Sequence, residues 1–213
     1  MIKGAIFDQD GLLFDTESVY QRAWIEAGRR QGVIIDPAVP RRFSGMGRKL
    51  IKEIIAAEYP LLDWEEYSKT AIELAWNEQL SSIPPKKPGL IEMLSFCREN
   101  GIKTAVASSS RIHIVRHNLT SSGVIDYFDA ITTGEEVVNS KPAPDIFLLA
   151  ASKIGIEPKD CAVFEDAFSG IRGAHAAGMK PILIPDQAEP TGEIRQIAAV
   201  YPTLDAAIEE LRK

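Results

Sequence analysis

The sequence predicts an α/β protein in which a doubly wound, mostly parallel sheet is interrupted by an inserted helical segment. From residue 102 onward, short β-branched runs alternate with amphipathic stretches, which is the pattern of parallel strands connected by helices. An earlier apolar run, GAIF, is followed by a long stretch of helical periodicity without a strand. A chain of 213 residues has room for one core domain with a smaller insertion.

The core is predicted to be Rossmann-like and to comprise residues 1–15 and 83–213. Its expected strands are KGAIF (3–7), IKTAVA (102–107), DAITT (129–133), CAVFE (161–165) and KPILI (180–184). Helices between them end at Gly101 and Gly178, because glycine readily adopts the left-handed conformation that terminates a helix.

Residues 16–82 are predicted to form a helical cap over the sheet. Helical periodicity covers residues 17–32, 49–59 and 64–80. The segment SSIPPKKPG then returns the chain to the core, and its prolines make a stiff connector. A cap joined by two chain crossings can rock over the sheet. Its tryptophans are expected to be core or lid contacts: Trp24, Trp64 and Trp76.

Composition excludes several classes of partner. The net charge is −6 and no run of Lys or Arg occurs, so a nucleic-acid surface is not expected. No apolar stretch is long enough to span a bilayer, and the first residues lack the features of a signal peptide. We therefore expect a cytoplasmic protein without a membrane partner, monomeric or weakly dimeric. Cys97 and Cys161 are expected to be reduced and buried.

Polar side chains follow the predicted strands where each strand ends. In a parallel sheet these carboxyl ends share one edge, and ligands bind in the crevice beside it. The candidate site residues there are Asp8, Asp10, Ser108, Ser109, Lys141, Glu165 and Asp166. Carboxylates that converge without His or Cys favour a hard cation with oxygen ligands, and Mg²⁺ is the usual choice when phosphate is also bound.

These side chains predict phosphoryl transfer with water as the final acceptor. Asp8 can attack phosphorus and form an aspartyl-phosphate. Asp10 can protonate the leaving oxygen and then take a proton from water. Ser108 and Lys141 would hold the phosphoryl oxygens, with the lysine acting as a point charge.

Each motif also has a plainer interpretation when taken alone. Asp8 and Asp10 could form a turn after a strand. One of the three serines at 108–110 could cap the helix expected over residues 111–119, although a helix N-terminus also attracts phosphate. Lys141 could be a surface lysine, and the acidic pair at 165–166 could cap the following helix.

With its four motifs in order, the chain resembles the haloacid dehalogenase superfamily of phosphotransferases. The motifs are DQDGLLFDTE, VASSS, KPAPDIF and FEDAFSGIRGAHAAGM, and the resemblance covers essentially the whole chain. It implies that Asp8 is the nucleophile and Asp10 the acid/base, and that Ser108 and Lys141 bind phosphate. The implied Mg²⁺ ligands are Asp8, the Asp10 backbone carbonyl and Asp166, with Glu165 close by. The dehalogenases lack the second aspartate of the first motif, so Asp10 indicates phosphoryl transfer.

Within the superfamily the chain is most similar to the branch of β-phosphoglucomutases and sugar phosphatases. In the cap loop SGMGRK, Arg48 could reach a second anionic or polar group of the substrate, and Gly45 and Gly47 allow the backbone to approach. β-Phosphoglucomutase has a His in the first cap helix and a Lys in the last one. This chain has Tyr20 at the first position and no clear lysine at the second.

Hydrolysis of a small sugar or polyol phosphate is therefore the predicted reaction, and a phosphomutase is the alternative. A phospho-receiver signalling module is an alternative from another class, because it also gathers acidic residues, a Ser or Thr and a Lys on a doubly wound sheet. Receivers are smaller and take the phosphate at a later strand, whereas Asp8 follows the first strand.

Overall fold

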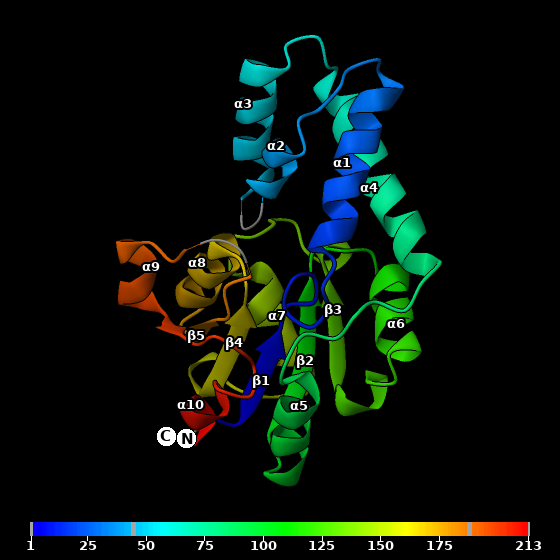
Figure 1. Ribbon diagram of the computed structural model, residues 1–213. Helices are drawn as coiled ribbons and strands as arrows, with labels where there is room; N and C mark the ends of the chain where they lie inside the picture. The colour runs from blue at the N-terminus through cyan, green and yellow to red at the C-terminus, as the bar shows by residue number, and fades with distance from the viewer. Residues whose placement is uncertain (1, 44–45, 187–188, 213) are drawn as a thin grey trace.

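The core of the protein is a parallel sheet. The computed structural model describes residues 2–43, 46–186 and 189–212. Within them lies one six-stranded sheet in the order β3-β2-β1-β4-β5-β6, and every neighbouring pair is parallel (Figure 1). The strands are β1 Gly4–Phe7, β2 Lys103–Ser108, β3 Ala130–Thr133, β4 Cys161–Glu165, β5 Lys180–Leu183 and β6 Ala199–Val200. The predicted fold class is confirmed.

The sequence pattern does not predict β6, because a strand of two residues leaves no alternation to detect. The five other strands lie where they were expected, with ends that differ by at most one residue. Gly101 and Gly178 have φ values of +67° and +70°, which confirms their expected role at helix ends.

Helices cover both faces of the sheet. They are α5 Leu90–Glu99, α6 Ile112–Ser121, α7 Asp145–Ile154, α8 Phe168–Ala176, α9 Gly192–Ile197 and α10 Ile208–Leu211. Short 3₁₀ helices lie in the connections at Ile125–Tyr127, Gly134–Glu136 and Pro158–Asp160. Alternate residues of β1 point to opposite faces, so Phe7 packs in the cluster with α5 and α6, whereas Ile6 packs with α7 and α8.

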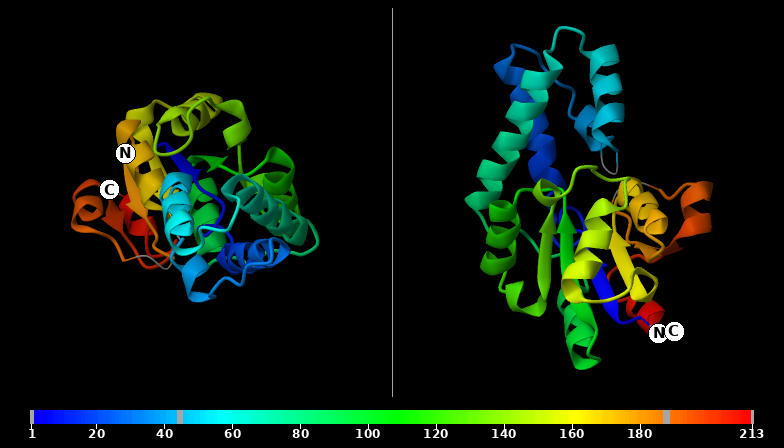
Figure 2. Two further views of the ribbon diagram at one scale, coloured as in Figure 1. Left: turned by 90° about the horizontal axis from the view of Figure 1, so that it is seen from above. Right: turned by 180° about the vertical axis from the view of Figure 1, so that it is seen from behind.

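The helices between β1 and α5 form a separate layer above the carboxyl edge of the sheet (Figures 1 and 2). We call them the cap: α1 Glu17–Arg30, α2 Ala38–Arg41, α3 Arg48–Glu58 and α4 Trp64–Leu80. They enclose a hydrophobic cluster of their own, in which the Trp24 and Trp64 rings stack with centroids 6.2 Å apart. The sequence pattern does not predict α2, whose four residues include a proline.

The two chain crossings to the cap are hydrogen-bonded to each other. Asp15 N donates to Pro85 O over 2.9 Å, and Lys87 N donates to Leu13 O over 3.0 Å. Phe14 and Lys86 form an antiparallel bridge between these bonds. We call this pair of segments, 13–15 and 85–87, the hinge ribbon. The predicted division of the chain at residues 16 and 82 stays a prediction.

Two further findings concern expectations from composition. Cys97 and Cys161 are both free and buried, as predicted. None of the helices in the described parts of the chain combines the length and apolar character that crossing a membrane requires.

Candidate active site

The candidate site lies at the carboxyl edge of the sheet, beside the central strand on whose two sides the order of the strands along the chain diverges. This strand is β1, and its neighbours are β2 and β4. Asp8 directly follows β1, and its backbone N–H donates to Phe164 O of β4 over 3.0 Å. The backbone therefore fixes where Asp8 stands, and its side chain is largely buried. Ligands of open parallel sheets bind in this position.

Lys141 ties the strand ends together. Its Nζ lies 2.5 Å from Asp8 Oδ1 and 2.6 Å from Glu165 Oε1, and it donates to Ala107 O over 3.0 Å. The side chain is only 8% exposed. Burial by itself would lower the pKa of Lys141, but the two carboxylates outweigh burial and raise it. The ammonium is therefore charged at neutral pH, and the surface-lysine interpretation is wrong.

Asp8, Glu165 and Asp166 form an acidic cluster next to this lysine. One carboxylate oxygen of each lies within 4.8 Å of the others, and all three residues are buried. Burial raises the pKa of Glu165 to about 7, and Asp8 adds to this rise although Lys141 opposes it. Burial, and then the charges of Asp8 and Glu165, raise the pKa of Asp166 well above its ordinary value. An all-oxygen donor set with this excess of negative charge fits a hard divalent cation such as Mg²⁺.

Glycines make room for these carboxylates. A Cβ on Gly170 would lie 2.0 Å from Glu165 Oε1, and a Cβ on Gly11 would lie 2.2 Å from Asp166 Oδ2. Gly11 also has a φ of +86°, which favours glycine. Side chains at these positions would displace the acidic cluster.

Asp10 is held apart from that cluster by the loop after β2. Its Oδ2 accepts a hydrogen bond from Ser110 Oγ over 2.8 Å, and Ser108 Oγ approaches it at 3.4 Å. Its Oδ1 is buried without a partner among the described residues. Burial, and then the charge of Asp8, raise the pKa of Asp10 to about 6. A carboxyl that titrates near neutrality is suited to both giving and taking a proton.

The serine loop is arranged differently from the sequence-based expectation. Ser108 is fully buried and accepts a hydrogen bond from Ser110 N over 3.0 Å. It does not line the cavity described below, whereas Ser109 and Ser110 do. The alternative that one of these serines caps the next helix is wrong, because Arg111 is the N-cap residue of α6.

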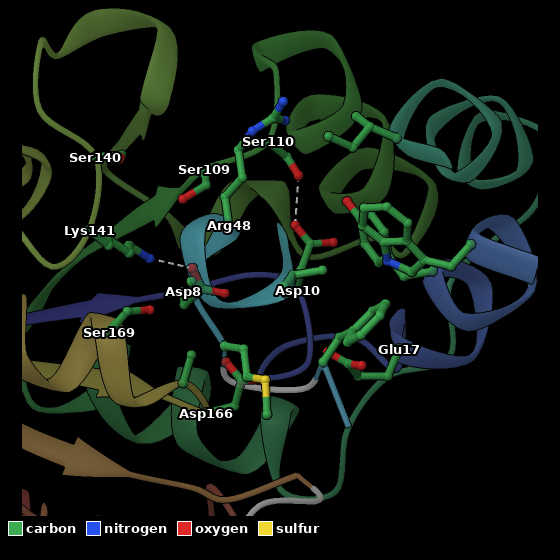
Figure 3. Close-up of a pocket in the computed structure, with 18 of the residues that line it drawn as sticks. Asp8, Asp10, Glu17, Arg48, Ser109, Ser110, Ser140, Lys141, Asp166 and Ser169 are labelled. Atoms are coloured by element: carbon green, nitrogen blue, oxygen red, sulfur yellow. Dashed lines mark hydrogen bonds and ion pairs between the residues drawn. The ribbon is translucent and has the colours of Figure 1, made fainter. Parts of the chain in front are cut away.

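A cavity of about 470 Å³ separates the carboxyl edge from the cap (Figure 3). Its walls differ. From the core come Asp8, Asp10, Ser109, Ser110, Ser140, Lys141, Glu165, Asp166, Ala167 and Ser169. From the cap come Glu17, Tyr20, Trp24, Phe43, Met46, Gly47, Arg48, Ile51, Trp64, Ile72 and Trp76. The predicted residues thus converge on one cavity, with the exception of Ser108.

Arg48 stands at the start of α3 and lines the cavity, and its contact with substrate stays a prediction. Its guanidinium is 3.0 Å from Glu65 Oε2, donates to Ser68 Oγ over 2.9 Å and lies 5.3 Å above the Trp64 ring. These contacts hold it against the cap. Gly47 also lines the cavity, whereas Gly45 lies outside the described residues.

Sequence reasoning missed Glu17 as a residue that lines the cavity, whereas Tyr20 was named only through the family resemblance and Trp76 only as a core or lid contact. Glu17 stands in the first turn of α1, where an acidic residue is common because it suits the helix dipole. Tyr20 and Trp76 sit within ordinary helical periodicity. Nothing in their spacing distinguishes these positions from surface residues.

Comparisons with known proteins agree with this architecture. A family model described as haloacid dehalogenase-like hydrolase matches residues 2–178. Hexitol phosphatase B of Escherichia coli (strain K12) is 32% identical over 190 residues, which cover 86% of this chain and 84% of that protein. Fructose-1-phosphate phosphatase YqaB of the same organism is 33% identical over 180 residues, which cover 84% of this chain and 94% of that protein.

A solved structure with a similar fold is β-phosphoglucomutase from Clostridium difficile. It matches with a TM-score of 0.75 and 26% identity over 100% of this chain and 96% of that one. The structural match therefore includes both the sheet and the cap.

Proposed function

This chain belongs to the haloacid dehalogenase-like hydrolases, and we propose that it is a Mg²⁺-dependent phosphatase acting on a small sugar or polyol phosphate. The observation that carries the proposal is the contact of one buried lysine with Asp8 and Glu165, beside an all-oxygen acidic cluster. The names of two relatives, a hexitol phosphatase and a fructose-1-phosphate phosphatase, support this substrate class.

In the first step, an oxygen of Asp8 forms a bond to phosphorus while the bond from phosphorus to the leaving oxygen breaks. Asp10 donates its proton to that oxygen, so the leaving group departs as a neutral hydroxyl. In the second step, water attacks phosphorus, the bond to Asp8 breaks and Asp10 takes a proton from the water. Asp10 is then ready for another cycle.

Positive charge near the phosphoryl group offsets its negative charge. Lys141 supplies a fixed ammonium next to Asp8. Ser109 lines the cavity and is a further candidate phosphate ligand, and Ser108 retains that proposed role from the sequence. The proposed metal ligands are Asp8, the Asp10 backbone carbonyl and Asp166, with Glu165 close by. When bound there, Mg²⁺ would neutralise charge shared by the carboxylates and the phosphoryl group.

A screen of phosphorylated metabolites tests the proposal. Free phosphate is measured with wild-type protein and with Asp8→Asn, each in MgCl₂ and in EDTA. We expect release from sugar or polyol phosphates that requires both Mg²⁺ and Asp8, with kcat reduced at least about 10³-fold in the variant, because the isosteric amide is not a nucleophile.

Other outcomes separate the alternatives. Wild-type activity in Asp8→Asn would overturn the proposal. An isomerised sugar phosphate with little free phosphate would identify a phosphomutase, and a long-lived aspartyl-phosphate without turnover would identify a receiver. The cytoplasmic location and the monomeric or weakly dimeric state stay predictions.

A further inference from the structure

A basic and an acidic side chain of the cavity, Arg48 and Glu17, have no part in the proposed reaction. Glu17 begins α1, directly after the hinge ribbon, and its carboxyl group lines the cavity together with Asp10 and Asp166. In the view of Figure 3, Glu17 and Lys141 lie on opposite sides of the Asp8–Asp10 pair. Glu17 is therefore placed where the part of the substrate beyond the phosphoryl group would lie.

The Glu17 carboxyl group lacks a partner. Within the described parts of the chain it makes no hydrogen bond or ion pair with another side chain. Burial raises its pKa to about 7, and the charges of Asp186 and Asp10 add to this rise, whereas Lys87 opposes it. Lys87 is itself paired with Asp186. A half-buried carboxyl group without a partner can accept hydrogen bonds from a ligand that enters the cavity.

The cationic side chains that line the cavity already pair with carboxylates of the protein. Among the described lining residues they are Arg48 and Lys141. Lys141 contacts Asp8 and Glu165, and Arg48 contacts Glu65, which also pairs with Lys52. A second anionic group of the substrate near Glu17 would thus lie next to a carboxylate. Each cation among the described lining residues already pairs with a carboxylate of the protein.

The rest of the cap wall is mainly apolar. Its aromatic members are Tyr20, Trp24, Phe43, Trp64 and Trp76. Such rings suit the C–H faces of a sugar or polyol, whereas hydroxyl groups on the same molecule need polar partners. Glu17 can supply one at the core end of this wall.

We propose that Glu17 is a specificity-determining residue that binds hydroxyl groups of a neutral, polyhydroxylated leaving group and excludes substrates with a second anionic group at that place. This inference rests on the proposed phosphatase function and narrows its substrate class. It predicts that the enzyme discriminates against carboxylated and bisphosphorylated substrates.

The test compares wild type with Glu17→Leu, Glu17→Gln and a control, Glu53→Gln. Glu53 is exposed on α3, so this control makes the same change of charge on the cap away from the cavity. The substrates are a hexitol phosphate, phosphoglycolate and p-nitrophenyl phosphate, whose leaving group has no alcohol hydroxyls. Both Glu17 variants should unfold at or above the wild-type temperature, because they remove a carboxyl group that burial destabilises.

For the hexitol phosphate, Glu17→Leu should raise KM by about 10- to 100-fold, the loss expected for hydrogen bonds to a charged group. Activity on p-nitrophenyl phosphate should change by less than about threefold. Glu17→Gln keeps a hydrogen-bonding oxygen without the charge. Its KM for the hexitol phosphate should stay within about fivefold of the wild-type value. Its kcat/KM for phosphoglycolate should improve by roughly tenfold.

Calorimetric binding of the hexitol phosphate to Asp8→Asn and to Asp8→Asn/Glu17→Leu gives a readout that does not need turnover. Equal affinities, or unchanged KM in Glu17→Leu, would overturn the role of Glu17 even if the enzyme is a phosphatase. A wild-type preference for phosphoglycolate would overturn it as well. Conversely, a wild-type protein that hydrolyses none of the esters, yet binds the hexitol phosphate through Glu17, would overturn the proposed function alone.

Discussion

The two walls of the cavity are built on different physical principles. On the core side, charged groups are buried, and Lys141 holds Asp8 and Glu165 together at the ends of strands whose backbones are hydrogen-bonded to each other. On the cap side, the lining is largely aromatic, Arg48 is about half exposed, and Glu17 has no protein partner within the described residues. The core side is thus preorganised for charge, whereas the cap side leaves polar groups for a ligand.

This difference assigns the reaction to the core wall and the choice of substrate to the cap wall. Groups that must meet a phosphoryl group within a fraction of an ångström follow the strand ends directly, as Asp8 does, or are held against them, as Lys141 is. Groups that distinguish substrates stand on helices connected through the hinge ribbon, which can adapt to different leaving groups. Substitutions on the two walls should therefore have effects of different size and kind.

The largest expected effect is that of Lys141→Met. Removal of this ammonium leaves Asp8 and Glu165 buried without their counter-charge, so kcat should fall about 10²- to 10³-fold and the free energy of unfolding by about 3 kcal/mol. Steady-state kinetics and urea unfolding measure these changes. The matched control is Lys153→Met, because Lys153 also pairs with a carboxylate at 2.6 Å, that of Glu136, but is more exposed.

That control should lose less than about 1 kcal/mol, as is usual for exposed ion pairs. If both variants lost the same stability and Lys141→Met kept more than a tenth of the activity, Lys141 would not be the essential counter-charge of Asp8 and Glu165.

An intermediate effect is expected from pH. Burial raises the folded-state pKa values of Asp10, Glu17, Glu165 and Asp166 above their unfolded values, the first to about 6 and the next two to about 7. Between the unfolded and folded values, the folded protein binds more protons than the unfolded chain. Without Mg²⁺, the free energy of unfolding should therefore fall as pH rises from about 4 to about 7.

Thermal unfolding in EDTA and in MgCl₂ at several pH values tests this sign. Mg²⁺ should flatten the dependence, because a cation at the acidic cluster favours the ionised carboxylates. If the free energy of unfolding instead rose with pH in EDTA, the folded state would not raise the pKa values of these carboxyl groups.

The smallest effect is expected from Arg48→Ala on the cap wall. Its ion pair with Glu65 is half exposed, so KM should change by less than about fivefold and kcat should stay the same. Arg42→Ala is a suitable control, because Arg42 pairs with Glu58 elsewhere on the cap. A tenfold or larger rise in KM specific to Arg48→Ala would show that this arginine binds substrate directly.

The core wall was largely predictable from sequence, since the topology of a parallel sheet brings its strand ends to one edge. That geometry places Asp8, Glu165 and Asp166 together although many residues separate them in the chain. It does not specify which of three adjacent hydroxyl groups turns toward the cavity, because the three serines lie at the end of β2 and in the loop that follows it. The prediction named Ser108 and Ser109 but not Ser110, which donates a hydrogen bond to Asp10 and lines the cavity together with Ser109.

The cap wall was less predictable. Its helices were recognised from their periodicity, but which of their faces meets the sheet depends on the direction of the chain at the hinge ribbon. In the sequence, Glu17 therefore resembles any acidic residue in the first turn of a helix, and Trp76 resembles any apolar residue of an amphipathic helix. The short elements β6 and α2 contain too few residues to carry a pattern.

The hinge ribbon also makes the protein divisible. The outgoing and returning segments lie side by side as an antiparallel bridge at Phe14 and Lys86, so the chain enters and leaves the cap at one place. Outside this ribbon, α4 of the cap also contacts α6 of the core, where Asn118 Nδ2 donates to Gln79 Oε1 over 2.8 Å. Grafting another family member's insertion onto the hinge ribbon would exchange the selecting surface and leave the reacting groups of the sheet untouched. Chimeric enzymes with new substrate ranges are accordingly an engineering route that this connection opens.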